Sequence, residues 1–291
     1  MRIKRVGSID ASKKRRSIAS ADGLTLPLFD DRESRVVAIA LQSGSNGNCI
    51  YVETEDVRLL FDAGIPGSHA EKRLAAYGRD IREVDAVIIS HDHADHVRCA
   101  GVLQRKYHLP LYMTRSTHEA AKNRCPLGTL NEVRHFRAGQ VLHIKNVRIE
   151  TIPTPHDAAD GVAFVVEAAC RRLGILTDLG HVFEGLTDIV KSLDGVFLES
   201  NYDPEMLRVG SYPDFLKRRI EGPHGHISNQ EAAKLLCSAM RSNRMKWACL
   251  AHLSEENNQP ALAIATHQRI LPSDFTLHVA SRYESVGSFI L

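Results

Sequence analysis

The sequence has no long hydrophobic run, few aromatic residues and little excess of charge of either sign. Its longest uninterrupted apolar run, residues 36–41, has six residues, whereas a membrane-spanning helix needs about 20. No apolar stretch follows the charged residues at the start of the chain, so we expect no secretion signal and no membrane partner. Aromatic residues make up 6% and hydrophobic residues 43% of the 291 residues. These fractions are typical of a globular protein and exclude collagen-like and disordered classes.

Paired cysteines are also missing. None of the six cysteines belongs to a Cys-x-x-Cys pair, which argues against a zinc ribbon and against a thioredoxin-like redox motif. Widely scattered cysteines are typical of free thiols in a reducing compartment. We therefore expect a cytoplasmic protein. The six positions are Cys49, Cys99, Cys125, Cys170, Cys237 and Cys249.

The small net charge of +2 is unevenly distributed along the chain. Residues 1–34 hold eight basic and five acidic residues, a net +3, which leaves 29 basic and 30 acidic residues, a net −1, in the other 257. We predict a flexible basic tail at residues 1–34 and a single domain at residues 35–291. The tail could contact nucleic acid or be a simple solvated extension, and its composition leaves both open.

From residue 36 onward the pattern predicts alternating strands and helices. Apolar residues at helical spacing predict helices at residues 70–77 and 97–107. Another helix should begin at Ser228, because Ser228 and Glu231 have the spacing of a capping box. Strands in hairpins, followed by strands separated by helices, favour a mixed α/β (α+β) fold in which helices cover sheets. Short β-branched runs predict strands at residues 36–41, 50–53, 57–61, 85–90, 111–114, 141–144, 147–152, 162–167, 174–177 and 247–251.

Histidine is abundant, with 15 in the chain, and several are clustered. Residues 90–96 read Ser-His-Asp-His-Ala-Asp-His directly after a predicted buried strand. His91 and His93 can face one centre, and Asp95 and His96 can turn to a second. Imidazole and carboxylate ligands suit zinc, manganese or iron. The alternative is a histidine-rich surface turn without a metal.

Four further ligand-type residues also stand at the ends of predicted strands. They are Asp62, His156, Asp178 and His252. Taken singly, each could be an ordinary turn residue. Polar residues at several strand ends nevertheless fit one site assembled at a single edge of the sheets.

In their order along the chain, these residues resemble the metallo-β-lactamase superfamily. Members carry Asp, then His-x-His-x-Asp-His, then His, Asp and His at strand ends, and the match spans about residues 36–255. The resemblance implies a four-layer αβ/βα sandwich that holds two divalent metal ions, zinc or manganese, with iron as a further candidate. It implies that Asp178 bridges both ions and that Asp62 is a catalytic carboxylate beside the metal-held water. The other ligands it implies are His91, His93 and His156 for the first ion, and Asp95, His96 and His252 for the second.

The second half of the chain narrows the resemblance. Residues 225–233 and 251–254 are similar to the Gly-His and Thr-His-x-Ser regions of tRNase Z-type phosphodiesterases. This similarity implies that His226 contacts the phosphate or protonates the leaving group, unless it merely precedes the helix. Residues 43–48, 199–203 and 252–258 more closely resemble the YycJ/WalJ (VicX-like) family. We expect Asn201, Ser228 and Asn229 in these motifs to contact the substrate.

That family resemblance implies a metal-dependent phosphodiesterase, a 5′-exonuclease on DNA, in which a hydroxide bridging the metals attacks phosphorus. Asp178 and His252 are 74 residues apart, too close for an inserted β-CASP domain. The basic run Lys217 to Arg219 could bind phosphates or be a solvated helix face. Alternatives are a small-molecule hydrolase on the same site, such as a cyclic phosphodiesterase, lactonase or glyoxalase II-like thioesterase, and a non-catalytic binding module. A homodimer is also left open.

Overall fold

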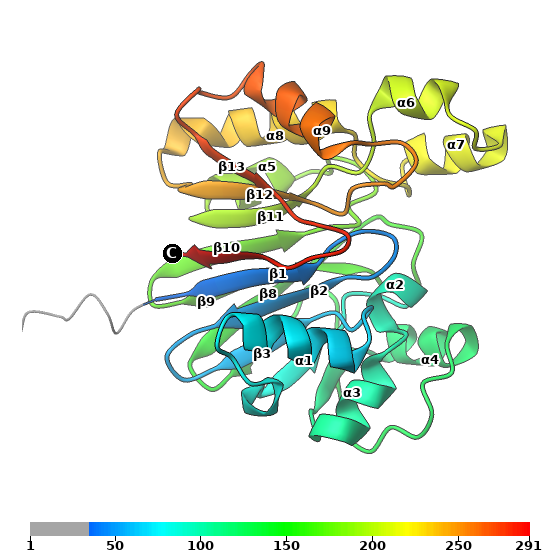
Figure 1. Ribbon diagram of the computed structural model, residues 1–291, viewed down its shortest axis with the longest axis vertical. Coiled ribbons are helices and arrows are strands. Elements are labelled where there is room, and N and C mark those ends of the chain that lie inside the picture. The colour runs from blue at the N-terminus through cyan, green and yellow to red at the C-terminus, as the bar shows by residue number, and fades with distance from the viewer. Residues whose placement is uncertain (1–34) are drawn as a thin grey trace, which may run out of the picture. The chain divides into compact units, whose positions relative to one another are not determined.

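A computed structural model describes residues 35–291, apart from the side chain of Arg241. The tail predicted at residues 1–34 lies outside the described residues. Two seven-stranded mixed sheets form the centre of the domain, with helices on their outer faces (Figure 1). No helix in the described part of the chain is long and apolar enough to cross a membrane.

The first sheet contains the early strands and the last strand of the chain. Its order is β14-β1-β2-β3-β4-β5-β6. Strands β3 to β6 run parallel to one another, so their carboxyl ends meet at one edge. The strand bounds are β1 Val37–Gln42, β2 Cys49–Glu53, β3 Arg58–Phe61, β4 Ala86–Ile88, β5 Leu111–Thr114, β6 Val133–Phe136 and β14 Val286–Ile290.

The second sheet contains the later strands. Its order is β13-β12-β11-β10-β9-β8-β7, and β10 to β13 are parallel. The strand bounds are β7 Val141–Ile144, β8 Val147–Pro153, β9 Val162–Ala168, β10 Arg171–Leu176, β11 Gly195–Glu199, β12 Trp247–Ala251 and β13 Thr276–Val279.

Apolar side chains pack in three layers that hold the helices and sheets together. One cluster lies between the two sheets and includes Phe61 and Phe164, whose rings are 5.1 Å apart. A second joins the first sheet to α1 and α3, and a third joins the second sheet to α5, α8 and α9. This is the predicted αβ/βα sandwich, and the mixed α/β class is confirmed. The helix bounds are α1 Gly67–Ala76, α2 Ala94–Val97, α3 Ala100–Tyr107, α4 Arg115–Arg124, α5 Leu186–Lys191, α6 Pro204–Val209, α7 Asp214–Glu221, α8 Asn229–Ala239 and α9 Pro260–Gln268.

The helix predicted over residues 97–107 is present from Ala100 onward but is interrupted at residues 98–99. Helix α2 ends at Val97 and α3 begins at Ala100. Ala63, in the loop after β3, donates its N–H to His96 O (2.7 Å) and accepts from Cys99 N (2.9 Å). These two bonds take backbone groups that a continuous helix would need. The break anchors the histidine motif to the end of β3.

Candidate metal centre

The predicted site residues gather at the edge where both sheets present strand ends. Asp62 follows β3, the histidine motif follows β4, and His156, Asp178 and His252 follow β8, β10 and β12. Asp62, Asp178 and His252 have positive φ angles of 66°, 57° and 55°. Left-handed backbone is uncommon for residues other than glycine, and such strain concentrates at functional sites. Each of these three turns directs a polar side chain at the point where the chain leaves its strand.

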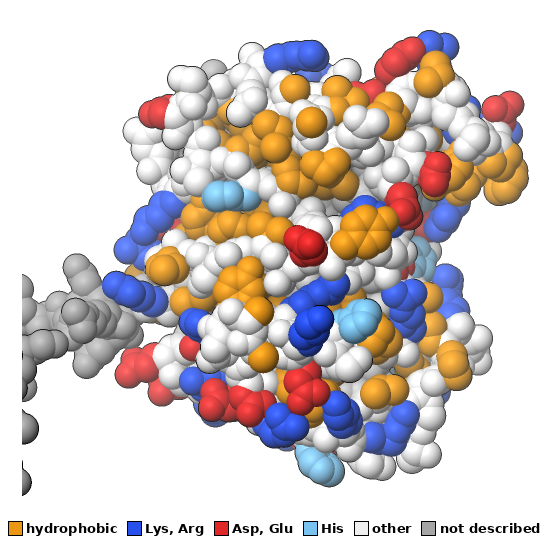
Figure 2. Space-filling model, viewed as in Figure 1, with side chains coloured by type: hydrophobic (Ala, Val, Ile, Leu, Met, Phe, Trp, Pro, Cys, Tyr) orange, Lys and Arg blue, Asp and Glu red, His pale blue; other side chains and the backbone are white. Residues whose placement is uncertain are grey.

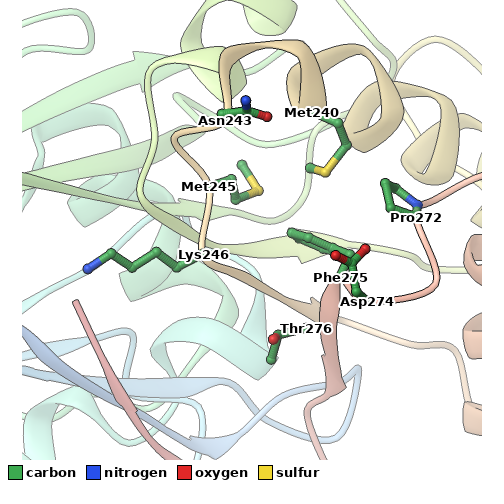
Figure 3. A pocket seen from close by; sticks show the side chains of 8 residues that line it. All are labelled: Met240, Asn243, Met245, Lys246, Pro272, Asp274, Phe275 and Thr276. Carbon is green, nitrogen blue, oxygen red and sulfur yellow. The ribbon is translucent and has the colours of Figure 1, made fainter.

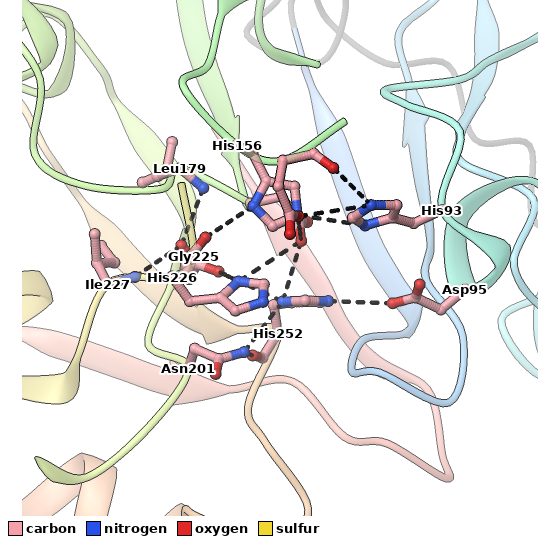
Figure 4. A network of polar contacts seen from close by, with 12 residues as sticks. His93, Asp95, His156, Leu179, Asn201, Gly225, His226, Ile227 and His252 are labelled. Atoms are coloured by element: carbon pink, nitrogen blue, oxygen red, sulfur yellow. Dashed lines mark hydrogen bonds and ion pairs between the residues drawn. The ribbon is translucent and has the colours of Figure 1, made fainter. Parts of the chain in front are cut away.

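Four overlapping groups of potential ligand atoms gather at this edge, and one of them combines Asp178 and His252 with Glu199 and His226. Two other groups share no residue, and each draws on both sheets. The nitrogens of His91, His93 and His156 form one group, in which all ligand atoms lie within 4.8 Å of one another. The second group has the same spread. The structure thus brings together the same two sets that the resemblance implied. Figure 4 shows two members of each set, His93 and His156 of the first and Asp95 and His252 of the second. The members of the second group are Asp95, His96 and His252.

Asp178 lies between the two groups. Its Oδ2 is 3.4 Å from His96 Nε2, and its Oδ1 is 3.6 Å from His156 Nε2. Neither carboxylate oxygen has a hydrogen-bond partner although both are buried, and His91 Nε2 is in the same situation. Buried polar atoms without partners are costly, and divalent cations held by nitrogen and oxygen donors would satisfy them. The donor set therefore fits the divalent metal ions that this fold implies.

Opposite charges dominate the electrostatics of the centre. Burial raises the pKa of Asp178, but the imidazoles of His252 and His96 outweigh it and hold that pKa well below its usual value. Burial alone would lower the pKa of His252, yet Asp178 and Asp95 raise it to about 10. A metal-ligating histidine must be neutral, so cation binding competes with protons here.

Asp62 supports the centre from behind. Its Oδ2 is 2.7 Å from His96 Nδ1, and its two oxygens accept from the backbone N–H (2.8 Å) and the hydroxyl (3.0 Å) of Ser90. Asp62 is buried and does not line the cavity beside the centre. A carboxylate on the far nitrogen of a ligating histidine fixes the ring's orientation and tautomer. The geometry thus favours a positioning role for Asp62.

The loop before β2 holds Asp95 in place. Asn48 donates its backbone N–H to Asp95 O (2.8 Å) and its amide to Asp95 Oδ2 (3.2 Å). Gly64 passes so close that a Cβ there would lie 1.6 Å from Asp95 O. Only glycine permits this approach, which brings the ends of β3 and β4 together.

Glu199 is the functional residue that sequence reasoning missed. It is fully buried at the end of β11, and its Oε1 accepts from His226 Nδ1 at 2.6 Å. Its Oε2 accepts from the backbone N–H groups of Leu179 (3.1 Å) and Ile227 (3.2 Å) (Figure 4). Burial raises the pKa of Glu199, but His226 outweighs it and lowers that pKa to about 2. The available signal was position, because Glu199 ends an apolar strand as Asp62 and His252 do.

A cavity of about 220 Å³ opens beside the two ligand groups. His226 and Asn201 line it, and Asn201 also donates to His252 O at 2.8 Å. The ligand-type residues that line it are His93, Asp95, Asp178 and His252. Helix α7 forms its other wall through Leu216, Arg219 and Ile220. The cavity therefore places an imidazole that is not in either ligand group beside the candidate metal positions.

Ser228 and Asn229 do not line this cavity. The hydroxyl of Ser228 accepts from Glu231 N (3.2 Å), and the backbone N–H of Ser228 donates to Glu231 Oε2 (2.8 Å), which completes the predicted capping box of α8. Asn229 is fully buried, and its Oδ1 accepts from Ser200 (2.5 Å) and Asn258 (2.9 Å). Both side chains therefore stabilise the fold, Ser228 by capping α8 and Asn229 by joining buried hydrogen bonds, and neither is placed to contact a substrate in the cavity.

The three basic residues of α7, Lys217 to Arg219, have different surroundings. Arg219 lines the cavity and pairs with Asp157 (2.5 Å), the residue after His156. Lys217 donates to Arg208 O at 2.9 Å, and Arg218 is exposed. Arg219 alone of the three thus lies at the cavity.

Another cavity, of about 470 Å³, opens at the opposite end of the second sheet, where β12 and β13 begin (Figure 3). Met240, Met245 and Phe275 line it, with Asp274 as its single carboxylate. It brings no cluster of metal-ligating side chains together and lies apart from the chemistry described above.

Comparison with known proteins agrees with this geometry. A family model described as a beta-lactamase superfamily domain matches residues 57–247. Exodeoxyribonuclease YycJ of Bacillus anthracis is 34% identical over 231 residues, which cover 79% of this chain and 87% of YycJ. Exodeoxyribonuclease WalJ of Streptococcus pneumoniae is 37% identical over 228 residues, which cover 78% of this chain and 84% of WalJ.

A solved structure shows the same fold. The metallo-β-lactamase fold protein YhfI of Bacillus subtilis matches with a TM-score of 0.67 at 17% identity, over 88% of this chain and 99% of YhfI. At that identity the likeness establishes the fold alone, whereas the family model and the two relatives establish kinship in sequence. The chain belongs to the metallo-β-lactamase superfamily, in the branch that includes YycJ and WalJ.

Proposed function

We propose that this protein is a metal-dependent phosphodiesterase that removes nucleotides from DNA as a 5′-exonuclease. The observation that carries the proposal is a histidine held by a buried carboxylate, His226 on Glu199, in a cavity that members of both metal-type ligand groups also line. The names of the relatives YycJ and WalJ support nuclease activity on DNA.

The residues that would hold two ions, zinc or manganese, are the two ligand groups with Asp178 shared between them. The chemistry that divalent ions supply at such a centre is activation of water and neutralisation of charge on the phosphate. Asp62 orients His96 through its 2.7 Å contact, and the carbonyl of Gly225 orients His156 through its 2.8 Å contact with Nδ1. These contacts fix which nitrogen of each ring faces the centre.

His226 is the group we propose as the proton donor. Its Nδ1 is held by Glu199, which leaves Nε2 as the nitrogen available to a substrate. The Glu199 carboxylate fixes the orientation of the imidazole through this 2.6 Å contact. A proton given to the departing oxygen lowers the barrier to breaking the phosphorus–oxygen bond.

The surface charge contributes little to this assignment. Acidic and basic side chains are interspersed over the face shown in Figure 2, and residues 35–291 carry a net charge of −1. Attraction of a phosphodiester is therefore expected at the metal centre, with Arg219 beside it. A small-molecule hydrolase would use the same centre, so the choice between them rests on the relatives and on substrate tests.

The proposal is tested with oligonucleotides labelled at the 5′ or 3′ end, as single and double strands of DNA and RNA, with added Mn²⁺ or Zn²⁺. Bis(p-nitrophenyl) phosphate and a thioester serve as small substrates, and Asp178→Asn serves as the inactive control. We expect stepwise release of nucleotides from the 5′ end of DNA. Turnover of a small substrate alone would refute the nuclease assignment, and release from the 3′ end would refute its polarity.

A further inference from the structure

A second recess borders the catalytic cavity. It measures about 470 Å³ and has an apolar floor that includes Leu253 and Ala280, both buried. Ser254 lines both spaces, so the recess adjoins the cavity. Its wall is formed by the last residue of β13, Val279, by residues 280–283 after it, and by the segment that follows His252.

Tyr283 stands at this recess with its ring open to solvent. In the described part of the chain, Tyr283 and Phe215 are the two exposed aromatic residues, with 63% and 69% of their surface accessible. The Tyr283 hydroxyl donates to Glu255 Oε1 at 2.5 Å, and Arg73 of α1 donates to its backbone carbonyl. Tyr283 is therefore anchored at both its hydroxyl and its backbone while the ring stays exposed.

Arg282 connects the segment that carries Tyr283 to residues beside the candidate metal centre through hydrogen bonds. Its guanidinium donates to Glu255 Oε2 (2.9 Å), to Leu253 O (2.9 Å) and to the hydroxyl of Ser45 (3.1 Å). Ser45 lines the catalytic cavity, and Leu253 directly follows the ligand-type residue His252. The position of the Tyr283 ring is thus fixed relative to the candidate catalytic atoms.

We propose that this recess is a nucleobase subsite, with Tyr283 as its stacking surface, for a nucleotide next to the scissile phosphodiester. The inference rests on the proposed nuclease function. An apolar floor beside an exposed aromatic ring suits a flat base, and stacking tolerates any sequence because every base has a π-face. The cation of this recess, Arg282, is already paired with Glu255 at 2.9 Å and so offers no free charge to a phosphate. The recess therefore suits the base, while the backbone stays at the centre.

The test compares Tyr283→Ala with Tyr283→Phe, which keeps the ring, and with Val102→Ala, an exposed apolar residue on α3. We expect Tyr283→Ala to raise KM for a single-stranded oligonucleotide by about tenfold, while Tyr283→Phe and Val102→Ala stay near wild type. Turnover of bis(p-nitrophenyl) phosphate, which has no base, should be unchanged in all three. An equal loss on the small diester, or no change in KM for Tyr283→Ala, would overturn the subsite.

A fluorescence measurement reports stacking without relying on cleavage. The probe is a single-stranded oligonucleotide with 2-aminopurine at its first, second or third position and phosphorothioate terminal linkages. We expect wild type and Tyr283→Phe to quench one of these positions and Tyr283→Ala not to. Quenching that is identical in Tyr283→Ala refutes the inference. Quenching by a wild-type protein that cleaves no DNA would support the subsite and refute the proposed activity, so the two failures are distinguishable.

Discussion

Asp178 is the residue of the candidate centre that contacts both ligand groups. It holds a left-handed backbone conformation, is buried, and reaches His96 of one ligand group and His156 of the other. A side chain shared by two sites couples them, because its loss affects both. The strain at this position is consistent with a functional rather than a stabilising task.

We therefore expect Asp178→Asn to lower the metal content of the purified protein and to abolish activity. Loss of an outer contact to a ligand commonly costs 10–100-fold, so loss of a shared direct ligand should exceed about 100-fold. Metal analysis by mass spectrometry and turnover of the small diester measure the two effects. Asp188→Asn, an exposed carboxylate on α5, is the matched control. Two ions per chain and normal turnover in Asp178→Asn would contradict the assignment.

Variants of Glu199 and His226 test the proposed proton donation to the leaving oxygen independently of metal binding. His226→Ala should lower kcat by about 100- to 10,000-fold, the range of general acid catalysis. Glu199→Gln should lower kcat by a smaller factor, since an uncharged amide would hold the His226 ring through a weaker hydrogen bond. Both variants should retain their metal, and Glu205→Gln on the exposed face of α6 should behave as wild type. An unchanged kcat in His226→Ala would remove it from the mechanism.

At the scale of the helix, α9 contains a buried histidine that the candidate centre does not use. His267 is fully buried, its Nδ1 donates to Ala263 O at 2.8 Å, and its Nε2 has no partner. Burial lowers the pKa of His267 to about 4. Between that value and its ordinary pKa near 6.5, the unfolded chain takes up a proton that the folded chain refuses, so stability falls as pH falls through this window.

The expected result is that the wild type loses about 2 kcal/mol more of its unfolding free energy than His267→Gln does between pH 7.5 and pH 5. Urea unfolding of both proteins at the two pH values measures this difference, and the other titrating groups cancel because both proteins share them. Parallel pH profiles for wild type and variant would show that His267 does not titrate in this window.

Strand ends were the most predictable elements, and the reason is physical. Buried strands such as β4 and β12 are continuous apolar runs, and the polar residue that ends each run marks the site edge. The split between α2 and α3 could not be predicted, because it depends on Ala63, a residue distant in sequence. Helices α6 and α7 were not predicted either. Their apolar residues, Leu207 and Ile220 among them, form a small separate cluster with little periodicity to detect.

At the scale of the whole molecule, the site exists only when the two sheets pack together. The first sheet supplies Asp62 and the histidine motif, and the second supplies His156, Asp178 and His252. The sequence could indicate Asp62, His156, Asp178 and His252 as candidate site residues, since each follows a predicted strand. It could not show that Glu199 meets His226, nor that Ser228 and Asn229 face away from the cavity, because side-chain direction depends on this packing.

Charge is the remaining feature of the whole chain. Residues 1–34 carry a net +3 and residues 35–291 a net −1. We propose that residues 35–291 form the catalytic domain and that the preceding segment adds affinity for the phosphate backbone. A chain beginning at Arg35 should then turn over bis(p-nitrophenyl) phosphate normally. Its logarithmic salt slope for single-stranded DNA should be shallower by about 0.7 for each lost phosphate contact. The slope is measured from KM at several salt concentrations. An unchanged slope would show that residues 1–34 contribute no affinity for DNA, and that the metal centre and Arg219 attract the phosphate backbone without them.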